Sequence, residues 1–156
     1  MKKRTKSRVF ALQMLYEVDL TGVDAEEALS NFWQAKGPAY AGGEGKVSEK
    51  KEERADVRAY AEELVRGVVE RRKEIDGWIE QFAEHWKIDR MACVDRNILR
   101  LGAYELIFEE DVPVKVALNE AVELAKVYGA PDSSKFVNGV LDKIAKTEGA
   151  KRGRMP

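Results

Sequence analysis

Helical periodicity between Asp95 and Leu141 constrains the fold more than any other feature of this sequence. Apolar residues recur there at intervals of three and four, first up to Asp111 and then from Pro113 to Gly129. This spacing places them on one face of an α-helix, and Pro113 and Gly129 are typical of a helix start and a helix end. No segment shows the apolar alternation of a half-buried strand. The sequence therefore predicts an all-α fold.

Further helices are predicted on either side of this stretch. The apolar pattern indicates one helix from Val9 to Leu20, one after Asp24, one long helix over 57–82 and a last one beginning at residues 132–134. Asp24 and Glu27 fit a capping box, in which the aspartate accepts a hydrogen bond from the N–H three residues later. Segment 37–51 is rich in glycine and lacks apolar periodicity, so it is predicted to be a flexible loop.

Composition limits the class of protein. A chain of 156 residues with 44% hydrophobic and 35% charged residues can form one compact domain with its own core. It has a single cysteine, Cys93, and no apolar run long enough for a signal peptide or a membrane span. We therefore expect a cytoplasmic protein without internal disulfides and without a membrane partner.

Charge is distributed unevenly along the chain. The net charge is −1, yet residues 1–8 carry +5 and residues 143–156 carry +4, which leaves −10 for residues 9–142. Such asymmetry indicates a localised contact with a polyanion, although a basic terminus can also be a solvated tail. The first segment, called the basic arm here, contains the cations Lys2, Lys3, Arg4, Lys6 and Arg8.

The basic arm lies on or just before the first turn of a predicted helix. The positive end of the helix macrodipole disfavours cations at that position by a few tenths of a kcal/mol up to about 1 kcal/mol. A bound phosphate backbone would supply the missing negative charge. We therefore expect the arm to contact a nucleic acid.

A second candidate contact lies where the last helix begins. Asp132 and Ser133 precede Lys135 and Phe136, and a helix start exposes backbone N–H groups that can hold an anion. A base stacked on Phe136 would contribute about 1–3 kcal/mol. Together with the arm, these residues predict a binding site for single-stranded RNA.

Residues for catalysis or metal binding are scarce. His85 and Cys93 are the only residues of their types, and each is more simply explained as a packed or surface residue. No pair of side chains has the spacing of metal ligands, and no glycine motif for phosphate binding is present. The sequence predicts neither an enzyme nor a cofactor. Arg96 and Arg100 are ambiguous, because they could contact RNA or form ion pairs with acidic neighbours.

Four ordered motifs resemble the NusB family of transcription antitermination factors. They cover most of the chain from the basic arm to about Lys143, apart from the loop at 37–51. The motifs are Arg8-x-x-Ala11-Leu12-Gln13-x-Leu15-Tyr16, Val94-Asp95-Arg96-x-Ile98-Leu99-Arg100-Leu101-x-x-Tyr104-Glu105-Leu106, Val112-Pro113-x-Lys115-Val116-Ala117-Leu118-Asn119-Glu120-Ala121-Val122-Glu123-Leu124-Ala125-Lys126, and Lys135-Phe136-Val137-Asn138-Gly139-Val140-Leu141.

The resemblance implies a fold of about seven helices in two small helical bundles. It also implies binding of a single-stranded boxA RNA element together with NusE, a small-subunit ribosomal protein. In this role the chain would join the antitermination complex of RNA polymerase, which reads through terminators in ribosomal RNA operons. The expected domain spans residues 1–147, with the arm at 1–8 and the loop at 37–51, and residues 148–156 would form a basic tail.

The resemblance also assigns roles to residues. Arg4, Lys6 and Arg8 match the family's basic arm, and Asp132, Lys135 and Phe136 match its second RNA-facing element. Tyr16 and Asp95 match positions on the surface for NusE. The chain departs from the family where lysine replaces arginine in the arm and where Ser7 replaces a small alanine. Lysine neutralises phosphate but lacks the planar fork of arginine.

Two alternatives remain at this level. NusB-like domains also precede methyltransferase domains in some RNA cytosine methyltransferases, but this chain ends before a cofactor-binding domain. The other alternative is a protein-only helical interaction module or homodimer without direct RNA contact. The RNA-binding hypothesis further expects that the basic arm and the start of the last helix grip one strand together.

Overall fold

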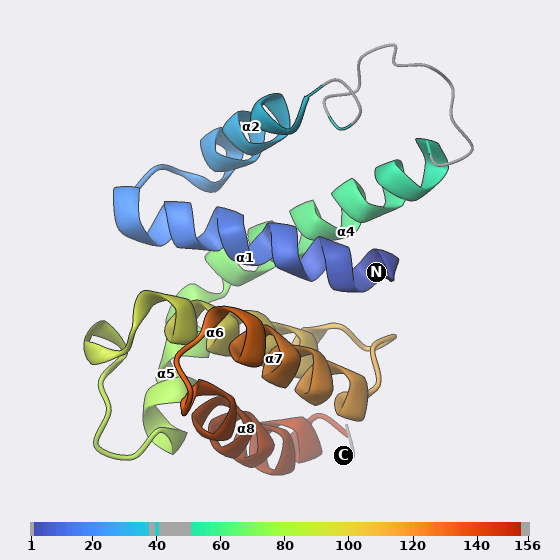
Figure 1. Cartoon of the computed structure of the whole chain (residues 1–156). Helices are drawn as coiled ribbons and strands as arrows, with labels where there is room; N and C mark the ends of the chain where they lie inside the picture. The colour runs from blue at the N-terminus through green and yellow to red at the C-terminus, as the bar shows by residue number, and fades with distance from the viewer. Residues whose placement is uncertain (1, 38–39, 41–50, 154–156) are drawn as a thin grey trace. The chain divides into compact units, whose positions relative to one another are not determined.

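The computed structural model describes residues 2–37, 40 and 51–153, and within these ranges every regular element is helical. This confirms the predicted all-α class, since no strand occurs among the described residues (Figure 1). The seven α-helices of the described ranges are α1 (Lys3–Thr21), α2 (Ala25–Lys36), α4 (Lys51–Glu70), α5 (Arg72–Phe82), α6 (Cys93–Phe108), α7 (Val114–Tyr128) and α8 (Ser133–Ile144). A 3₁₀ turn, η1 (Ile88–Arg90), precedes α6, and a π-helical segment, η2 (Ala145–Gly149), extends α8.

The chain divides into two compact units, Met1–Arg66 and Gly67–Pro156. Unit 1 contains α1, α2 and most of α4, and unit 2 contains α5 to α8 together with the end of α4 (Figure 1). Two small helical bundles are what the family resemblance implied. Each unit is described by itself below.

The helices of unit 1 are held together by an aromatic core and a hydrogen bond between helices, and α2 begins with a side-chain cap. Phe10 of α1 meets Trp33 of α2 edge to face, with the ring centroids 5.8 Å apart. The Asp24 carboxylate accepts a hydrogen bond of 2.8 Å from the Glu27 N–H, which confirms the predicted N-cap. The Ser7 hydroxyl donates a hydrogen bond of 2.8 Å to the Val57 carbonyl and thereby joins α1 to α4.

Unit 2 is built around α6, whose side chains are buried on almost every face because α5, α7 and α8 all pack against it. Gly102 allows α7 and α8 to approach α6 closely, since a Cβ at this position would lie 2.6 Å from Leu141 Cδ1 and 3.2 Å from Ala121 Cβ. The fully buried apolar residues of α6 are Ile98, Leu99, Leu101, Ala103 and Leu106.

Two expectations about the elements need correction. The first helix starts earlier than the predicted Val9, because α1 already begins at Lys3, and the basic arm therefore lies in its first turns. The long helix expected over 57–82 is two helices, since α4 ends at Glu70 and Arg71 has the non-helical dihedral angles φ −100° and ψ 13°. Helical structure also continues through residue 151, so most of the described part of the expected tail is helical; the tail boundary itself stays a prediction.

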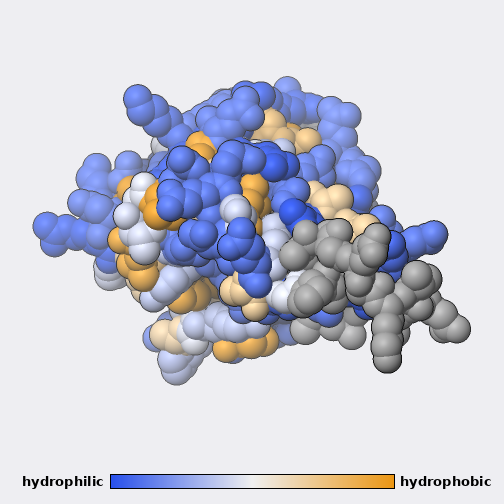
Figure 2. Space-filling model, turned by 90° about the horizontal axis from the view of Figure 1, so that it is seen from above, coloured by the Kyte–Doolittle hydropathy of each residue, from blue (hydrophilic) through white to orange (hydrophobic). Residues whose placement is uncertain are grey.

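The predicted loop falls mostly outside the described residues, because only Gly37, Tyr40 and Lys51 of segment 37–51 are described. In the described part of the chain, no helix has both the length and the apolar character that crossing a membrane requires. The face seen in Figure 2 is mostly hydrophilic, with hydrophobic residues in scattered patches, as expected for a chain with 35% charged residues.

Candidate nucleic-acid interface

Two arginines of α1 lie beside the ring of Tyr60 in unit 1. The guanidinium carbon of Arg4 lies 4.3 Å from the centroid of that ring, and that of Arg8 lies 5.9 Å away. Cations within about 6 Å of an aromatic face are attracted by its quadrupole. Tyr60 of α4 therefore orients two arginines that are one helical turn apart on α1.

Burial separates the members of the basic arm. Lys2, Lys3 and Arg4 are exposed and Lys6 is half-buried, whereas Arg8 is only 2% exposed. Lys3 forms a surface ion pair of 3.0 Å with Asp56. The structure thus places the Arg8 side chain in the interior of unit 1. A buried side chain is poorly placed to contact RNA, so the assignment of Arg8 to the RNA contact stays a prediction.

A groove of about 530 Å³ lies beside these cations. Its lining mixes both signs of charge, because Asp56 and Glu63 accompany Lys3 and Arg4, and a phosphate bound there would compete with the Asp56 carboxylate for Lys3. Tyr60 adds a flat apolar surface to the same groove. The lining residues are Lys3, Arg4, Ser7, Asp56, Ala59, Tyr60 and Glu63.

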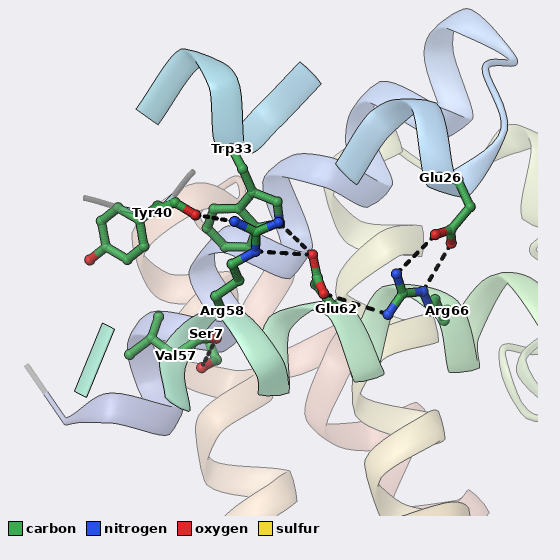
Figure 3. A network of polar contacts seen from close by, with 8 residues as sticks. All are labelled: Ser7, Glu26, Trp33, Tyr40, Val57, Arg58, Glu62 and Arg66. Atoms are coloured by element: carbon green, nitrogen blue, oxygen red, sulfur yellow. Dashed lines mark hydrogen bonds and ion pairs between the residues drawn. The ribbon is translucent and has the colours of Figure 1, made fainter. Parts of the chain in front are cut away.

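A polar network behind this surface fixes α2 against α4 (Figure 3). Glu62 Oε2 accepts hydrogen bonds from Trp33 Nε1 at 2.8 Å and from Arg58 Nε at 3.3 Å. Arg58 also donates to the Tyr40 carbonyl. Sequence reasoning missed this network, although the i, i+4 spacing of Arg58, Glu62 and Arg66 was a usable signal.

Arg66 extends the network to the start of α2. Its Nε and Nη2 atoms donate to the two carboxylate oxygens of Glu26, each at 2.9 Å (Figure 3). The hydrogen bond from Arg66 lowers the pKa of Glu26 and raises the pKa of the guanidinium, because each partner favours the charged form of the other. Both side chains are solvent-exposed, so the pair orients the helices more than it stabilises them.

In unit 2, α8 begins where the sequence predicted. Ser133 is buried. Its hydroxyl accepts a hydrogen bond of 2.9 Å from the Ala130 N–H, and the Ser133 backbone N–H donates to the Ala130 carbonyl at 2.9 Å. Asp132 occupies the N-cap position, but its side chain caps no backbone N–H in the described structure. Ser133 thus shapes the turn, whereas Asp132 and Lys135 are exposed.

A pocket of about 350 Å³ opens at this helix start. It brings Asp95 of α6 together with Asp132, although the resemblance assigned these residues to different partners. The Asp95 Oδ1 atom is buried and has no hydrogen-bond partner among the described residues. The pocket is lined by Trp86, Arg90, Met91, Ala92, Asp95, Ala130, Asp132, Ser133 and Phe136.

A second pocket of about 330 Å³ shares two of these aromatic residues, Trp86 and Phe136. Lys135 and Lys143 give it a positive lining, and Lys143 pairs with Glu84 at 3.1 Å. Sequence reasoning did not single out Trp86. Its position between His85 and Lys87, in a stretch that breaks the apolar periodicity, was the available signal.

The remaining candidates are placed as follows. Tyr16 is 40% exposed on α1 of unit 1. Arg100 is 3% exposed and forms an ion pair with Asp76, so of the two readings left open for it the ion pair is confirmed. Arg96 donates a hydrogen bond of 3.3 Å to the Met91 carbonyl. No group of three or more metal-type side chains occurs in the part of the chain that the structure describes.

Comparison with known proteins identifies relatives along nearly the whole chain. A sequence model of the NusB family matches residues 5–146. A protein of Anaeromyxobacter sp. (strain Fw109-5) named transcription antitermination protein NusB is 49% identical over 143 residues, which cover 92% of this chain and 90% of the relative.

Solved structures agree with the family match. A crystal structure of T. maritima NusB has a TM-score of 0.77 and 34% identity, covering 96% of this chain and 94% of that chain. A crystal structure of the antitermination factors NusB and NusE in complex with dsRNA has a TM-score of 0.75 and 35% identity, covering 94% of this chain and 98% of that chain.

Proposed function

Because the chain belongs to the NusB family, we propose that it is a transcription antitermination factor that binds boxA-type single-stranded RNA together with NusE. The observation that carries the proposal is the family match over residues 5–146, with curated relatives that bear the name of antitermination proteins. A solved relative that holds NusB, NusE and double-stranded RNA in one crystal supports RNA and NusE as partners, while the single-stranded boxA element follows from the family resemblance. The role is non-catalytic and serves read-through in ribosomal RNA operons within the RNA polymerase complex.

Unit 1 would hold the RNA backbone. Lys2, Lys3 and Arg4 are exposed, so their charges can neutralise phosphates, and Arg4 is already oriented by the Tyr60 ring. Phosphate contacts position a strand without reading its sequence. Lys6 lies 5.6 Å from the Tyr40 ring and 5.8 Å from the Phe10 ring, so its charge sits at the edge of the aromatic core.

Unit 2 would hold unstacked bases. Phe136 is partly exposed and lines both pockets, while Lys135 supplies a cation beside it. Single-stranded RNA is recognised through splayed bases that stack on aromatic side chains and hydrogen-bond along their edges. We further propose that the surfaces of unit 1 and unit 2 hold the same strand.

Contacts with NusE would involve Tyr16 and Asp95, as the family resemblance implies. Tyr16 shares α1 with Leu20, which is 57% exposed, so this part of unit 1 offers apolar surface to a protein partner. The acidic middle of the chain, −10 over residues 9–142, complements the basic charge expected of a ribosomal protein. A homodimer through the same apolar surface is the alternative partner.

Reconstitution tests the proposal directly. The chain, NusE and a boxA-type oligoribonucleotide are combined in pairs and together, and complexes are resolved by gel filtration and native mass spectrometry. The expected result is a ternary complex that assembles more tightly than either pair. Assembly with NusE that is unaffected by RNA would contradict the proposal and favour the protein-only module. A scrambled RNA of equal length is the control for sequence preference.

A further inference from the structure

Trp86 differs from the other tryptophans of the chain in its exposure. All three tryptophans lie among the described residues, and Trp33 and Trp78 are 2% and 9% exposed, whereas Trp86 is 54% exposed. Trp33 and Trp78 contribute to the cores of their units. An indole left half in solvent gives up most of the apolar burial available to a side chain of this size. Its position therefore needs an explanation other than packing.

The backbone before Trp86 is strained in a way that presents this side chain. Glu84 and His85 have φ values of 33° and 55°, and they are the non-glycine residues with positive φ in the described part of the chain. Side chains rarely adopt this conformation, and it persists where the surroundings impose it. The two residues follow the end of α5 at Phe82 and its C-cap Ala83, and Trp86 comes directly after them. Such outliers cluster at binding sites.

Trp86 and Phe136 are the two aromatic residues that line both pockets of unit 2. They come from segments about fifty residues apart in the sequence, one after α5 and the other in the first turn of α8. Two aromatic side chains at the junction of two neighbouring pockets can stack with a ligand in each. Flat ligands of repeating spacing, such as successive bases, match this arrangement.

The polar residues of the two pockets differ. The first pocket offers carboxylate acceptors, Asp132 and the buried Asp95 Oδ1, which needs a donor that the described residues do not provide. The second pocket is lined by Lys135 and Lys143, and because Lys143 pairs with Glu84 of the same lining, Lys135 is the cation placed to neutralise phosphate. Arg90 also lines the first pocket, and the amino groups of cytosine, adenine and guanine can donate to the carboxylates of that pocket.

We propose that Trp86 is an RNA-binding residue that forms, with Phe136, the shared wall of two adjacent base subsites in unit 2. The base in the first subsite presents an amino edge to Asp95, which thereby moves from the NusE surface given above to the RNA surface. The second subsite holds the neighbouring nucleotide beside Lys135. This inference rests on the proposed function, because it assumes that the ligand is RNA.

Intrinsic fluorescence tests the inference on the full chain, since Trp86 is the exposed tryptophan. The chain is titrated with a boxA-type oligoribonucleotide and with an abasic oligoribonucleotide of the same length, which keeps the phosphates but has no bases. We expect the first RNA to quench the emission of the wild-type chain and the abasic RNA to bind without quenching. Trp86→Phe should abolish the quench and keep affinity within about threefold, whereas Trp86→Ala should weaken binding about tenfold.

Matched variants separate a binding role from a structural one. Trp86→Ala should leave the thermal midpoint nearly unchanged, because the side chain is half exposed. Asp95→Asn should weaken binding of an amino-bearing oligo(C) more than binding of oligo(U), because oligo(U) has no amino group to donate.

Three results would overturn the inference, and they are distinguishable. Wild-type chain that binds neither RNA would remove the proposed function itself. RNA binding with no quench and with unchanged affinity of Trp86→Ala would refute the subsites alone. Quenching of Trp86 by NusE without RNA, with loss of NusE binding in Asp95→Asn, would show that the pocket receives a protein side chain instead.

Discussion

The Arg100 guanidinium and the Asp76 carboxylate form a two-pronged ion pair inside unit 2. Arg100 Nε lies 2.8 Å from Asp76 Oδ1, and Nη2 lies 3.1 Å from Oδ2. Arg100 Nη1 also donates a hydrogen bond of 3.0 Å to Asn97 Oδ1. With the Arg100 side chain only 3% exposed and that of Asp76 19% exposed, water screens this pair weakly.

Replacement of Arg100 by methionine should lower the free energy of unfolding by about 3 kcal/mol, the lower end of the range for a broken buried pair, because Asp76 would keep only its longer contact of 3.8 Å with Arg72. Urea unfolding followed by circular dichroism measures the loss. The matched control is Lys126→Ala, which removes a surface ion pair of 3.3 Å and should cost less than about 1 kcal/mol. Equal losses of unfolding free energy in the two variants would show that burial of the Arg100–Asp76 pair does not determine its contribution.

Removal of the Glu62 carboxylate should destabilise unit 1 through Trp33. In Glu62→Ala the buried indole N–H loses its acceptor, and we expect a loss of about 1–3 kcal/mol. A double-mutant cycle with Trp33→Phe isolates the pair, and a coupling of at least about 0.5 kcal/mol is expected. Additive effects in the cycle would show that the hydrogen bond contributes nothing measurable.

Titration of Glu26 should report on its contact with Arg66. The hydrogen bond from Arg66 holds the pKa of Glu26 below its usual value of 4.5. Because the pKa of Glu26 is lower in the folded state than in the unfolded state, the contact stabilises the protein at pH values above the unfolded-state pKa. This stabilisation is lost as the pH falls through the lower, folded-state pKa. Carboxyl chemical shifts in NMR should therefore show a midpoint below 4.5 in the wild type and a return toward 4.5 in Arg66→Gln.

A methyl group at residue 102 should disturb the contact between α6 and α8. Gly102→Ala would place a Cβ 2.6 Å from the buried Leu141 side chain, and overpacking of this kind costs about 1–3 kcal/mol. The thermal midpoint measures the effect. Gly139→Ala is the control, because a Cβ at Gly139 meets no described atom within 4 Å, and this variant should be neutral or slightly stabilising.

Loss of the Arg4 charge should weaken RNA binding by an electrostatic route. The logarithm of the affinity should fall with the logarithm of the salt concentration, and Arg4→Gln should reduce the slope by about 0.7 if it removes one phosphate contact. Fluorescence anisotropy at several salt concentrations gives the slope. Lys73→Gln changes an exposed cation of α5 that lines neither pocket described for unit 2, and its slope should equal that of the wild type.

The sequence predicted most of the helices because their signals are local. The Asp24 cap, the end of α7 at Gly129 and the start of α8 at Ser133 all depend on residues within one turn of the boundary. The break at Arg71 was not predicted, since the apolar stripe continues across it. The first turn of α1 was also not predicted, because it consists mainly of lysines and arginines and helical periodicity is read from apolar residues.

Features that depend on distant contacts were harder to predict. The residues Asp132, Ser133 and Phe136 were singled out from sequence, but their pocket also needs Trp86, which directly follows the positive-φ residues Glu84 and His85. Arg8 was assigned with the other cations of the arm, whereas its burial follows from packing beside Tyr60 of another helix. Charge alone does not distinguish an interior arginine from a surface one.

The interior location of Arg8 affects how selection acts on the first turns of the chain. A mutation of Arg8 would impair folding more than ligand binding. Its phenotype should therefore be temperature-sensitive and should be relieved by second-site changes that stabilise unit 1. Mutations of the neighbouring exposed lysines should show neither property. Genetic suppression can thus sort this short segment into residues kept for architecture and residues kept for recognition.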